Sequence, residues 1–423
     1  MRVFSDLHLH SKYSRATSEQ MDVENLARYA KLKGLNLLGT GDFTHPAWLA
    51  ELKSKLEPVG DTGLYEYADV WFMLTAEVST IYPHEGKTRK IHHIIHVPSF
   101  DAVDRINRRL ERHGSLSSDG RPVFDNLTSR DLVGMVLDCC DEALIVPAHL
   151  WTPWFSCLGS KSGFDSVEEC YQDMIKNIYA VETGLSSDPG MNWRLSALDK
   201  YTLVSNSDSH SPWPWRIGRE ANVFELEEVS YWEIYEVIRR KDKGRFLFTI
   251  EFFPEEGKYH FDGHRNCGVS MAPRETLRLN NICPKCGRRL TIGVLHRVEE
   301  LADRPEGFIP DDAVPYVSLV PLAEVISIAE GVKTYSSSLW GKYFKIVESL
   351  GSEFRVLLEV PEDELKKELP RRIAEGILRV RRGDVKINPG YDGQYGDVEI
   401  LEPEEGRKPQ RDLYDYLQNS PDS

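Results

Sequence analysis

The first 250 residues alternate short apolar runs with stretches of helical periodicity, and this alternation limits the possible fold more than any other feature of the chain. The runs VFSDLHL, LNLLGTGD, ALIVPAHL and YTLVSNSD are examples. Repetition of this kind predicts parallel strands joined by helices. Ionisable side chains stand at the ends of these runs, where an α/β barrel builds its active site. They are His8, His10, Asp42, Glu77, His149, Asp208 and His210.

Four of these residues form two pairs whose spacing suits metal ligands. His8 and His10 are separated by one residue, as are Asp208 and His210. Alternate residues of an extended strand point to the same side, so each pair can face one pocket. Imidazole and carboxylate donors together suit zinc, manganese or iron at an open hydrolytic site. A carboxylate such as Glu77 can bridge two cations, and two cations about 4 Å apart would activate a water for phosphoester cleavage.

The length of 423 residues predicts more than one domain. Periodicity changes along the chain, and we place the boundaries at these changes. We expect an α/β domain over residues 1–250, a small module over 251–312, a mainly helical domain with a glycine-rich loop over 313–402, and a flexible tail over 403–423.

Charge and composition restrict the class of partner and the compartment. A net charge of −15 argues against a protein that coats nucleic acid nonspecifically, although it leaves room for a local DNA channel. The chain has no apolar run of membrane-spanning length and does not open on an export signal. Its seven cysteines form no even framework for disulfides. We therefore expect an intracellular, cytoplasmic protein with no membrane partner.

Three of the cysteines belong to a second motif. His264-x2-Cys267 is followed by Cys283-x2-Cys286, the spacing of a closed tetrahedral structural zinc. His260 or His296 could replace His264 as the fourth ligand. We expect the zinc to fold a module that is too small to build its own core.

The strings SDLHLHSKYS, LLGTGDFTH, LTAEVS, PAHLW, AVETG and SNSDSH, in this order, resemble the PHP (polymerase and histidinol phosphatase) superfamily. This resemblance covers about half of the chain. It implies a distorted (β/α)7 barrel with two or three metals and phosphoesterase activity. It assigns His8, His10, Glu77 and Asp208 to the first metal, and Glu77, His149 and a histidine of IHHIIHV to the second. Of the two candidates for that last ligand we prefer His93 over His92.

The chain departs from the PHP pattern where relatives have Thr-Asp-His, because Gly41-Asp42-Phe43 stands there and the next histidine is His45. A third metal held by His210, Asp42 and His45 is therefore in doubt. These side chains could instead orient ligands or give a proton to the leaving group, so we count them with Asp208 as candidate catalytic residues.

The PHP half, together with GHRNCGVS, CPKCGRRL, VPYVSLVPLAEVI and INPGYDGQYG, resembles the endonuclease Q family nearly from end to end. The resemblance implies an archaeal DNA repair endonuclease that acts on damaged DNA, double- or single-stranded. Such an enzyme cuts 5′ to an abasic site or to a deaminated base such as uracil, hypoxanthine or xanthine. The rival interpretations are a small-molecule phosphatase on the same barrel and a noncatalytic DNA-binding module.

Several further side chains could contact DNA. Aromatic rings follow the ligands closely, basic residues could meet phosphates, and the glycine-rich loop could read the carbonyl oxygen that deamination creates. Core packing, structural ion pairs and a tight turn are the respective alternatives. The residues are Trp151, Trp154, Phe155 and Trp213, then Lys161, Arg194 and Arg216, and then Gly390, Tyr391 and Gly393.

The tail carries Gln410-x-x-Leu413-x-x-Tyr416-Leu417. This string is similar to the PIP box that binds the sliding clamp PCNA, although its last position departs from the usual aromatic residue. An ordinary packed helix is the alternative. A repair nuclease would favour the clamp as the partner.

Overall fold

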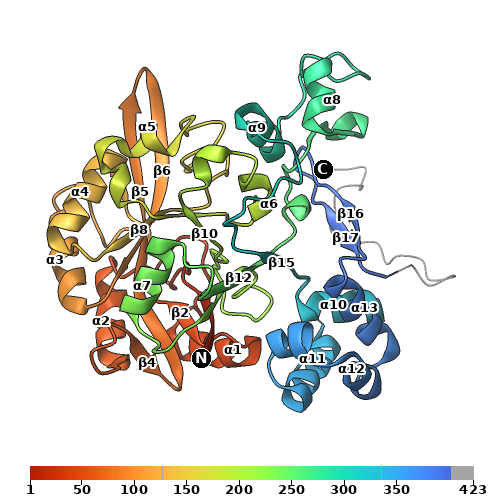
Figure 1. Ribbon diagram of the computed structural model, residues 1–423, viewed down its shortest axis with the longest axis horizontal. Helices are drawn as coiled ribbons and strands as arrows, with labels where there is room; N and C mark the ends of the chain where they lie inside the picture. Colours follow the sequence, from red (N-terminus) through yellow and green to blue (C-terminus); the bar gives the residue numbers. More distant parts are fainter. Residues whose placement is uncertain (126, 335, 402–423) are drawn as a thin grey trace, which may run out of the picture.

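The computed structural model describes residues 1–125, 127–334 and 336–401 (Figure 1). The predicted clamp-binding residues Gln410, Leu413, Tyr416 and Leu417 lie outside the described residues. Among the helices that the structure does describe, none is long and apolar enough to cross a bilayer.

A mixed sheet of 11 strands dominates the structure. Its main path runs β15-β12-β11-β1-β2-β5-β4-β3, with β6 and β7 also paired to β5, and β8 paired to β6. The strands are β1 (Arg2–Asp6), β2 (Leu37–Gly39), β3 (Glu57–Pro58), β4 (Tyr65–Tyr67), β5 (Val70–His84), β6 (Lys87–Val97), β7 (Val123–Asp125), β8 (Leu144–Pro147), β11 (Ala221–Glu225), β12 (Phe246–Glu251) and β15 (Tyr316–Ser318).

The expectation of parallel strands is only partly confirmed. β1, β2 and β5 are parallel neighbours, and β9 (Ala180–Glu182) and β10 (Thr202–Val204) form a parallel pair of their own. β5 and β6 are antiparallel, because only Glu85 and Gly86 separate them and both have positive φ, as a two-residue hairpin turn requires. β11 is antiparallel to both of its neighbours. The closed barrel that the PHP resemblance implies stays a prediction.

Helices surround the strands and start at capping side chains. Asp22 and Ser230, for example, each accept a hydrogen bond from the backbone N–H three residues further on. The helices of the α/β part are α1 (Val23–Lys33), α2 (Pro46–Lys55), α3 (Phe100–Leu110), α4 (Ser129–Cys139), α5 (Val167–Tyr171), α6 (Pro189–Asn192) and α7 (Tyr231–Arg240), with the short 3-10 turns η1 (Gln172–Asn177) and η2 (Ser196–Leu198).

Apart from β15, the described residues beyond β12 lie beside this part as a small module and a helical part (Figure 1). The module contains η3 (Pro254–Glu256), β13 (Asp262–His264), η4 (Arg265–Cys267), β14 (Val269–Met271), α8 (Pro273–Arg278) and α9 (Val294–Leu301). The predicted mainly helical C-terminal part is confirmed. It contains α10 (Leu322–Glu330), α11 (Ser337–Leu350), η5 (Arg355–Glu359), α12 (Glu362–Glu368), α13 (Arg371–Arg381) and the hairpin of β16 (Lys386–Asn388) and β17 (Asp397–Glu399).

A buried ion pair joins the helical part to the α/β part. Lys33 Nζ lies 2.8 Å from Glu353 Oε1, and both side chains are almost completely buried. Glu353 also accepts hydrogen bonds from the Tyr343 hydroxyl and from the backbone N–H of Leu322. A buried charge needs such partners, so these bonds fix the position of the two parts relative to each other.

Candidate active site

Four side chains from three separate regions of the chain meet, two beyond the end of β1, one beyond the end of β10 and one, contrary to the expected strand end, in the middle of β5. His8 and His10 follow β1, Glu77 lies within β5, and Asp208 follows β10. One ligand atom of each lies within 4.8 Å of one ligand atom of every other. His8, His10 and Glu77 are buried, and the Asp208 side chain is 27% exposed. The predicted first ligand set is thus assembled in one place and open to solvent at Asp208.

A second group shares Glu77 with the first. It consists of Glu77, His92 and His149, again within 4.8 Å of one another. His92 Nδ1 lies 2.8 Å from Glu77 Oε1, and His149 Nε2 lies 3.1 Å from the same oxygen. One carboxylate therefore faces both groups, as a bridging ligand must.

The preference for His93 is wrong. Glu77 stands opposite Ile94 in the β5–β6 ladder, so residues two positions from Ile94 share the Glu77 face and His93 lies on the other face. His93 instead contacts the hydroxyls of Thr80 and Tyr171. Burial lowers the pKa of His93 to about 3, so it is a neutral core residue.

A layer of carboxylates behind the ligands holds the imidazoles. Both oxygens of Glu182 lie 3.1 Å from His8 Nδ1, and Glu182 also accepts from the backbone N–H of His149. Asp42 Oδ1 lies 3.0 Å from His10 Nδ1, while Asp42 Oδ2 accepts from Ser11 and Ser14. Carboxylates in this position fix the ring orientation and raise the basicity of the other nitrogen. Asp42 is therefore a positioning residue.

The charges of the group support one another. Burial alone would lower the pKa of His8, but Glu182, Asp208 and Glu77 raise it well above its ordinary value. Burial would raise the pKa of Glu77, but His92, Arg121 and His8 lower it well below its ordinary value. Arg121 Nη1 lies 2.9 Å from Glu77 Oε2. The carboxylates are thus ionised and ready to bind cations.

The donor atoms fit divalent metals. His8 Nε2 is buried and has no hydrogen-bond partner among the residues that the structure describes, although Asp208 Oδ1 and Glu77 Oε1 lie 3.6 and 3.7 Å away. An unpaired buried nitrogen is costly unless a cation accepts its lone pair. Imidazoles and carboxylates suit zinc and manganese, and also magnesium where oxygens dominate.

The third metal proposed for His210, Asp42 and His45 gains no support. His210 lies beside the first group, with its ring 4.5 Å from that of His10, but belongs to neither candidate group among the described residues. The His45 ring stacks on Tyr13 at 4.4 Å, and His45 precedes α2 at the N-cap position without a capping hydrogen bond from its side chain. Both oxygens of Asp42 are engaged, Oδ1 by His10 and Oδ2 by the two serines.

Two of the predicted DNA contacts are wrong. Trp151 is only 1% exposed, and its Nε1 donates to Asn192 Oδ1 at 2.8 Å, so it is a core ring. Arg194 is buried, and its guanidinium forms an ion pair with Glu299 of α9, so it is not free to contact DNA. Trp213 stacks on Trp215, which lies against Trp340 of α11, so this ring contributes to the packing between the two parts.

Other predicted contact residues lie where DNA could reach them. Trp154 is 52% exposed, and the Phe155 ring lies 4.7 Å from that of His92. Lys90 Nζ lies 5.2 and 5.3 Å from these two rings. Lys161 is exposed in the same loop. The second group therefore has an aromatic and basic wall.

The glycine-rich loop does not offer free amides. The backbone N–H of Gly390 donates to Glu255 O at 2.7 Å, and that of Gly393 donates to Lys258 O at 3.0 Å. Tyr391 packs against Gly263, where a Cβ would come within 2.3 Å of its ring. The expected reading of a lesion by these amides is therefore wrong, because the amides attach the hairpin to the module.

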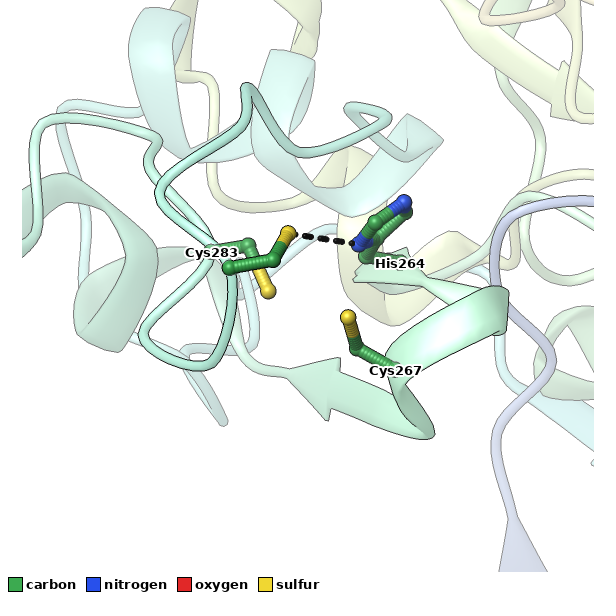
Figure 2. A group of neighbouring side chains, drawn as sticks. His264, Cys267 and Cys283 are labelled. Atoms are coloured by element: carbon green, nitrogen blue, oxygen red, sulfur yellow. Dashed lines mark hydrogen bonds between the residues drawn. The ribbon is translucent and has the colours of Figure 1, made fainter.

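The four predicted zinc ligands lie together in the module. Figure 2 shows His264, Cys267 and Cys283 pointing toward one another. Cys286 Sγ lies 3.3 Å from His264 Nδ1. Burial raises the pKa of Cys283, but the backbone N–H groups of Lys285 and Cys286 lower it overall to about 6, which favours the thiolate that a metal needs. His296 instead contacts Asp262 at 2.6 Å.

Three side chains that contact the ligands in the structure are absent from the site predicted from the sequence. His92 was the less favoured member of a pair, Glu182 ends β9 within the motif AVETG, and Arg121 lies in the loop before β7. Glu182 was visible as another carboxylate at a strand end. The sequence carried no signal for Arg121, because its contact with Glu77 spans 44 residues.

The fold agrees with solved structures of one family. The lesion-specific endonuclease PfuEndoQ from Pyrococcus furiosus is 34% identical to this chain with a TM-score of 0.85, covering 99% of this chain and all of that one. The chain belongs to the endonuclease Q family. The resemblance found in the sequence motifs is thereby confirmed, and with it the assignment to a family of endonucleases.

A second endonuclease Q structure contains a 27-mer duplex substrate with an abasic lesion at the active site. It is 35% identical to this chain, has a TM-score of 0.83, and the match covers 96% of this chain and 98% of that one. Residues 321–384 match the family model of the MJ0043 C-terminal domain. MJ0043 of Methanocaldococcus jannaschii is 35% identical over 59% of this chain, which spans only 31% of that protein.

Proposed function

We propose that this chain is a metal-dependent DNA repair endonuclease that cuts the phosphodiester bond 5′ to an abasic site or a deaminated base. Uracil, hypoxanthine and xanthine are the deaminated bases that we expect. The observation that carries the proposal is the pair of ligand groups sharing Glu77, in a chain 35% identical to an endonuclease Q bound to an abasic duplex. A noncatalytic module would have no need for two complete groups.

Divalent cations at the two groups would polarise the scissile phosphate and lower the pKa of the attacking water. His8, His10 and Asp208 would hold one cation, His92 and His149 the other, and Glu77 both. Glu182 and Asp42 keep the imidazole nitrogens aimed at the site. His210, which is one-third exposed, is the nearest candidate for proton transfer to the leaving oxygen.

Trp154 and Phe155 supply a wall on which a base beside the cut could stack. An exposed ring next to a cation suits single-stranded or everted nucleotides, because the ring contacts the base while the cation meets a phosphate. Trp154 and Lys90 have this arrangement, with Lys90 Nζ 5.2 Å from the ring. The structural zinc at His264, Cys267, Cys283 and Cys286 and the clamp PCNA at the tail complete the set of proposed partners.

The test is nicking of a labelled duplex that contains one uracil, hypoxanthine or abasic site, beside an undamaged duplex, with and without manganese or magnesium. We expect a metal-dependent cut 5′ to the lesion. Asp208→Asn should lower the rate by about three orders of magnitude, because several kcal/mol of transition-state stabilisation are lost at about 1.4 kcal/mol per tenfold.

Asp138→Asn is the matched control, because Asp138 is exposed on α4 and lies outside both groups. It should cut like the unmodified protein. Hydrolysis of a chromogenic phosphomonoester without any nicking would replace the proposal with a small-molecule phosphatase. Lesion binding without hydrolysis of either substrate would point to a recruiting module.

A further inference from the structure

A pocket next to the first ligand group contains two arginines that the proposed hydrolysis does not use. Its lining includes Asp208 and His210, Arg216 and Arg219, and the serines Ser18 and Ser209. Asp208 turns its Oδ1 to His10 Nε2, 3.0 Å away, so its charge is directed at the metal group. The positive charges of the two arginines are therefore the main charges that face the pocket.

The loop that bears these arginines is held at both ends. The backbone N–H of Gly218 donates to Asp6 Oδ2 at 2.8 Å, and Lys33 Nζ donates to Pro214 O at 2.8 Å. Trp215, in the same loop, lies 4.1 Å from the Trp340 ring of α11. The loop is therefore in place before any ligand arrives, which lowers the entropic cost of binding.

Arg219 is a fixed cation. Its side chain is 13% exposed, its Nη2 lies 2.9 Å from Glu324 Oε1 of α10, and its guanidinium lies 3.9 Å from the Phe252 ring centroid. Within the described part of the chain, the Arg219 Nε has no hydrogen-bond partner. Arg219 thus keeps donor capacity although Glu324 offsets its charge.

Arg216 is the cation without a partner. Its side chain is exposed and makes no hydrogen bond or ion pair with any residue that the structure describes. Loss of solvent and the neighbouring Arg219 lower the pKa of Arg216, while Glu324 and Tyr395 raise it. Two guanidinium groups that line one pocket attract an anion, since only Arg219 has a carboxylate partner among the described residues.

We propose that this pocket binds a phosphate of the DNA strand adjoining the scissile bond, with Arg216 as the contact and Arg219 as the supporting cation. The inference rests on the proposed endonuclease function. A guanidinium presents a planar fork of donors that matches phosphate oxygens, and phosphate contacts fix the register of a strand on a protein. The pocket would thus place the scissile bond against the ligand groups.

The experiment removes one charge from each side of the contact. Cleavage rates at subsaturating substrate are measured for the full chain and for Arg216→Gln, on lesion duplexes that carry one neutral methylphosphonate at successive positions beside the cut. We expect Arg216→Gln to lower cleavage of the unmodified duplex by about tenfold. At one position the methylphosphonate should lower the cleavage rate of the unmodified protein by a similar factor. At that position it should not lower the rate of Arg216→Gln any further.

Arg240→Gln, which alters an exposed arginine of α7, is the matched control and should lose the same factor at each methylphosphonate as the unmodified protein. Arg216→Lys should recover part of the loss, because it keeps the charge but not the fork. Losses that multiply at every position, or an Arg216→Gln rate equal to that of the unmodified protein, would overturn the proposal.

A second readout does not need the reaction. Binding of the lesion duplex without added manganese or magnesium is followed by fluorescence anisotropy at several salt concentrations, and Arg216→Gln should lower the salt slope by about one. An unchanged slope counts against the phosphate contact. If the unmodified protein nicks no lesion, the proposed endonuclease function is wrong, while the salt slope still tests whether Arg216 contacts a phosphate.

Discussion

The two kinds of candidate metal site in this chain are built in opposite ways. His8 and Asp208 are 200 residues apart in the sequence and meet only because β1 of the large sheet and β10 of the separate β9–β10 pair end side by side, where Leu9 and Ser209 form an isolated bridge. His264 and Cys286 are 22 residues apart and lie in a module whose own core cluster consists of Val269, Cys283 and Leu290. The fold makes the first site, whereas the second site has to make its own fold.

The donor atoms differ in the same sense. The first site offers imidazoles and carboxylates, with Asp208 and His210 open to a pocket. The second offers one imidazole and three thiols, a set that closes around zinc and leaves no position for a substrate. We infer that loss of metal should stop the chemistry at the first site and unfold the module at the second.

The largest effect that we expect is local unfolding of the module in Cys283→Ser. A structural zinc contributes roughly 10–16 kcal/mol in zinc-finger peptides, and a core of three residues cannot replace it. Hydrogen exchange should become fast over residues 259–293 and stay slow in β1 and β5. Metal analysis should show one zinc less per chain.

Cys139→Ser is the control, because Cys139 is a free cysteine at the end of α4 and lies outside the zinc group. It should keep its zinc. If Cys283→Ser kept both its zinc and its slow exchange, the module would have a core independent of the metal, and the contrast between the two sites would not hold.

A smaller effect is expected at the carboxylate layer behind the first site. Glu182→Gln keeps the shape but removes the charge that holds His8 Nδ1, 3.1 Å away. Changes of this kind cost about 10- to 100-fold in metal affinity or activity. Chelator competition should therefore show weaker binding at the first site, with an unchanged melting profile of the module.

The control for this change is Glu227→Gln, which alters an exposed carboxylate far from any ligand in sequence. Metal affinity should stay the same. Equal affinity in Glu182→Gln and the unmodified chain would mean that the fold alone orients His8, and that the second layer contributes little.

The sequence predicted which residue types are ligands better than it predicted which face of the sheet each side chain lies on. Histidines and carboxylates at strand ends are visible as residue types, and all of His8, His10, Glu77, His149 and Asp208 lie in the two groups. The choice between His92 and His93 depends on which residue of β6 stands opposite Glu77, and this register is fixed by the hairpin turn at Glu85 and Gly86. A run of two histidines carries no such information.

Contacts between distant segments were also beyond the sequence. The glycines of the β16–β17 loop are required because other backbone comes within 2.3 Å of a Cβ at Gly390, but the sequence does not show whether that backbone belongs to DNA or to the protein. The predicted DNA contact of Trp151 was wrong for the same reason, since its hydrogen-bond partner Asn192 lies 41 residues away in the sequence. Local spacing reveals chemistry, whereas long-range packing decides which side chains remain accessible.

The smallest effect that we expect separates the two regions by pH. Glu251 of β12 is fully buried, and burial raises its pKa to about 8 despite hydrogen bonds from Ser205 and Thr249. Because the folded pKa lies above the ordinary value of 4.5, the protonated acid favours folding below about pH 4.5, and this contribution is lost as the pH rises through 8. The melting temperature of the α/β part should fall between pH 6 and 9. Glu251→Gln should flatten this fall in melting temperature, whereas the exposed Glu227→Gln should not. If hydrogen exchange at pH 9 instead became fast first in the module, the zinc site, rather than the buried acid, would be the weaker region.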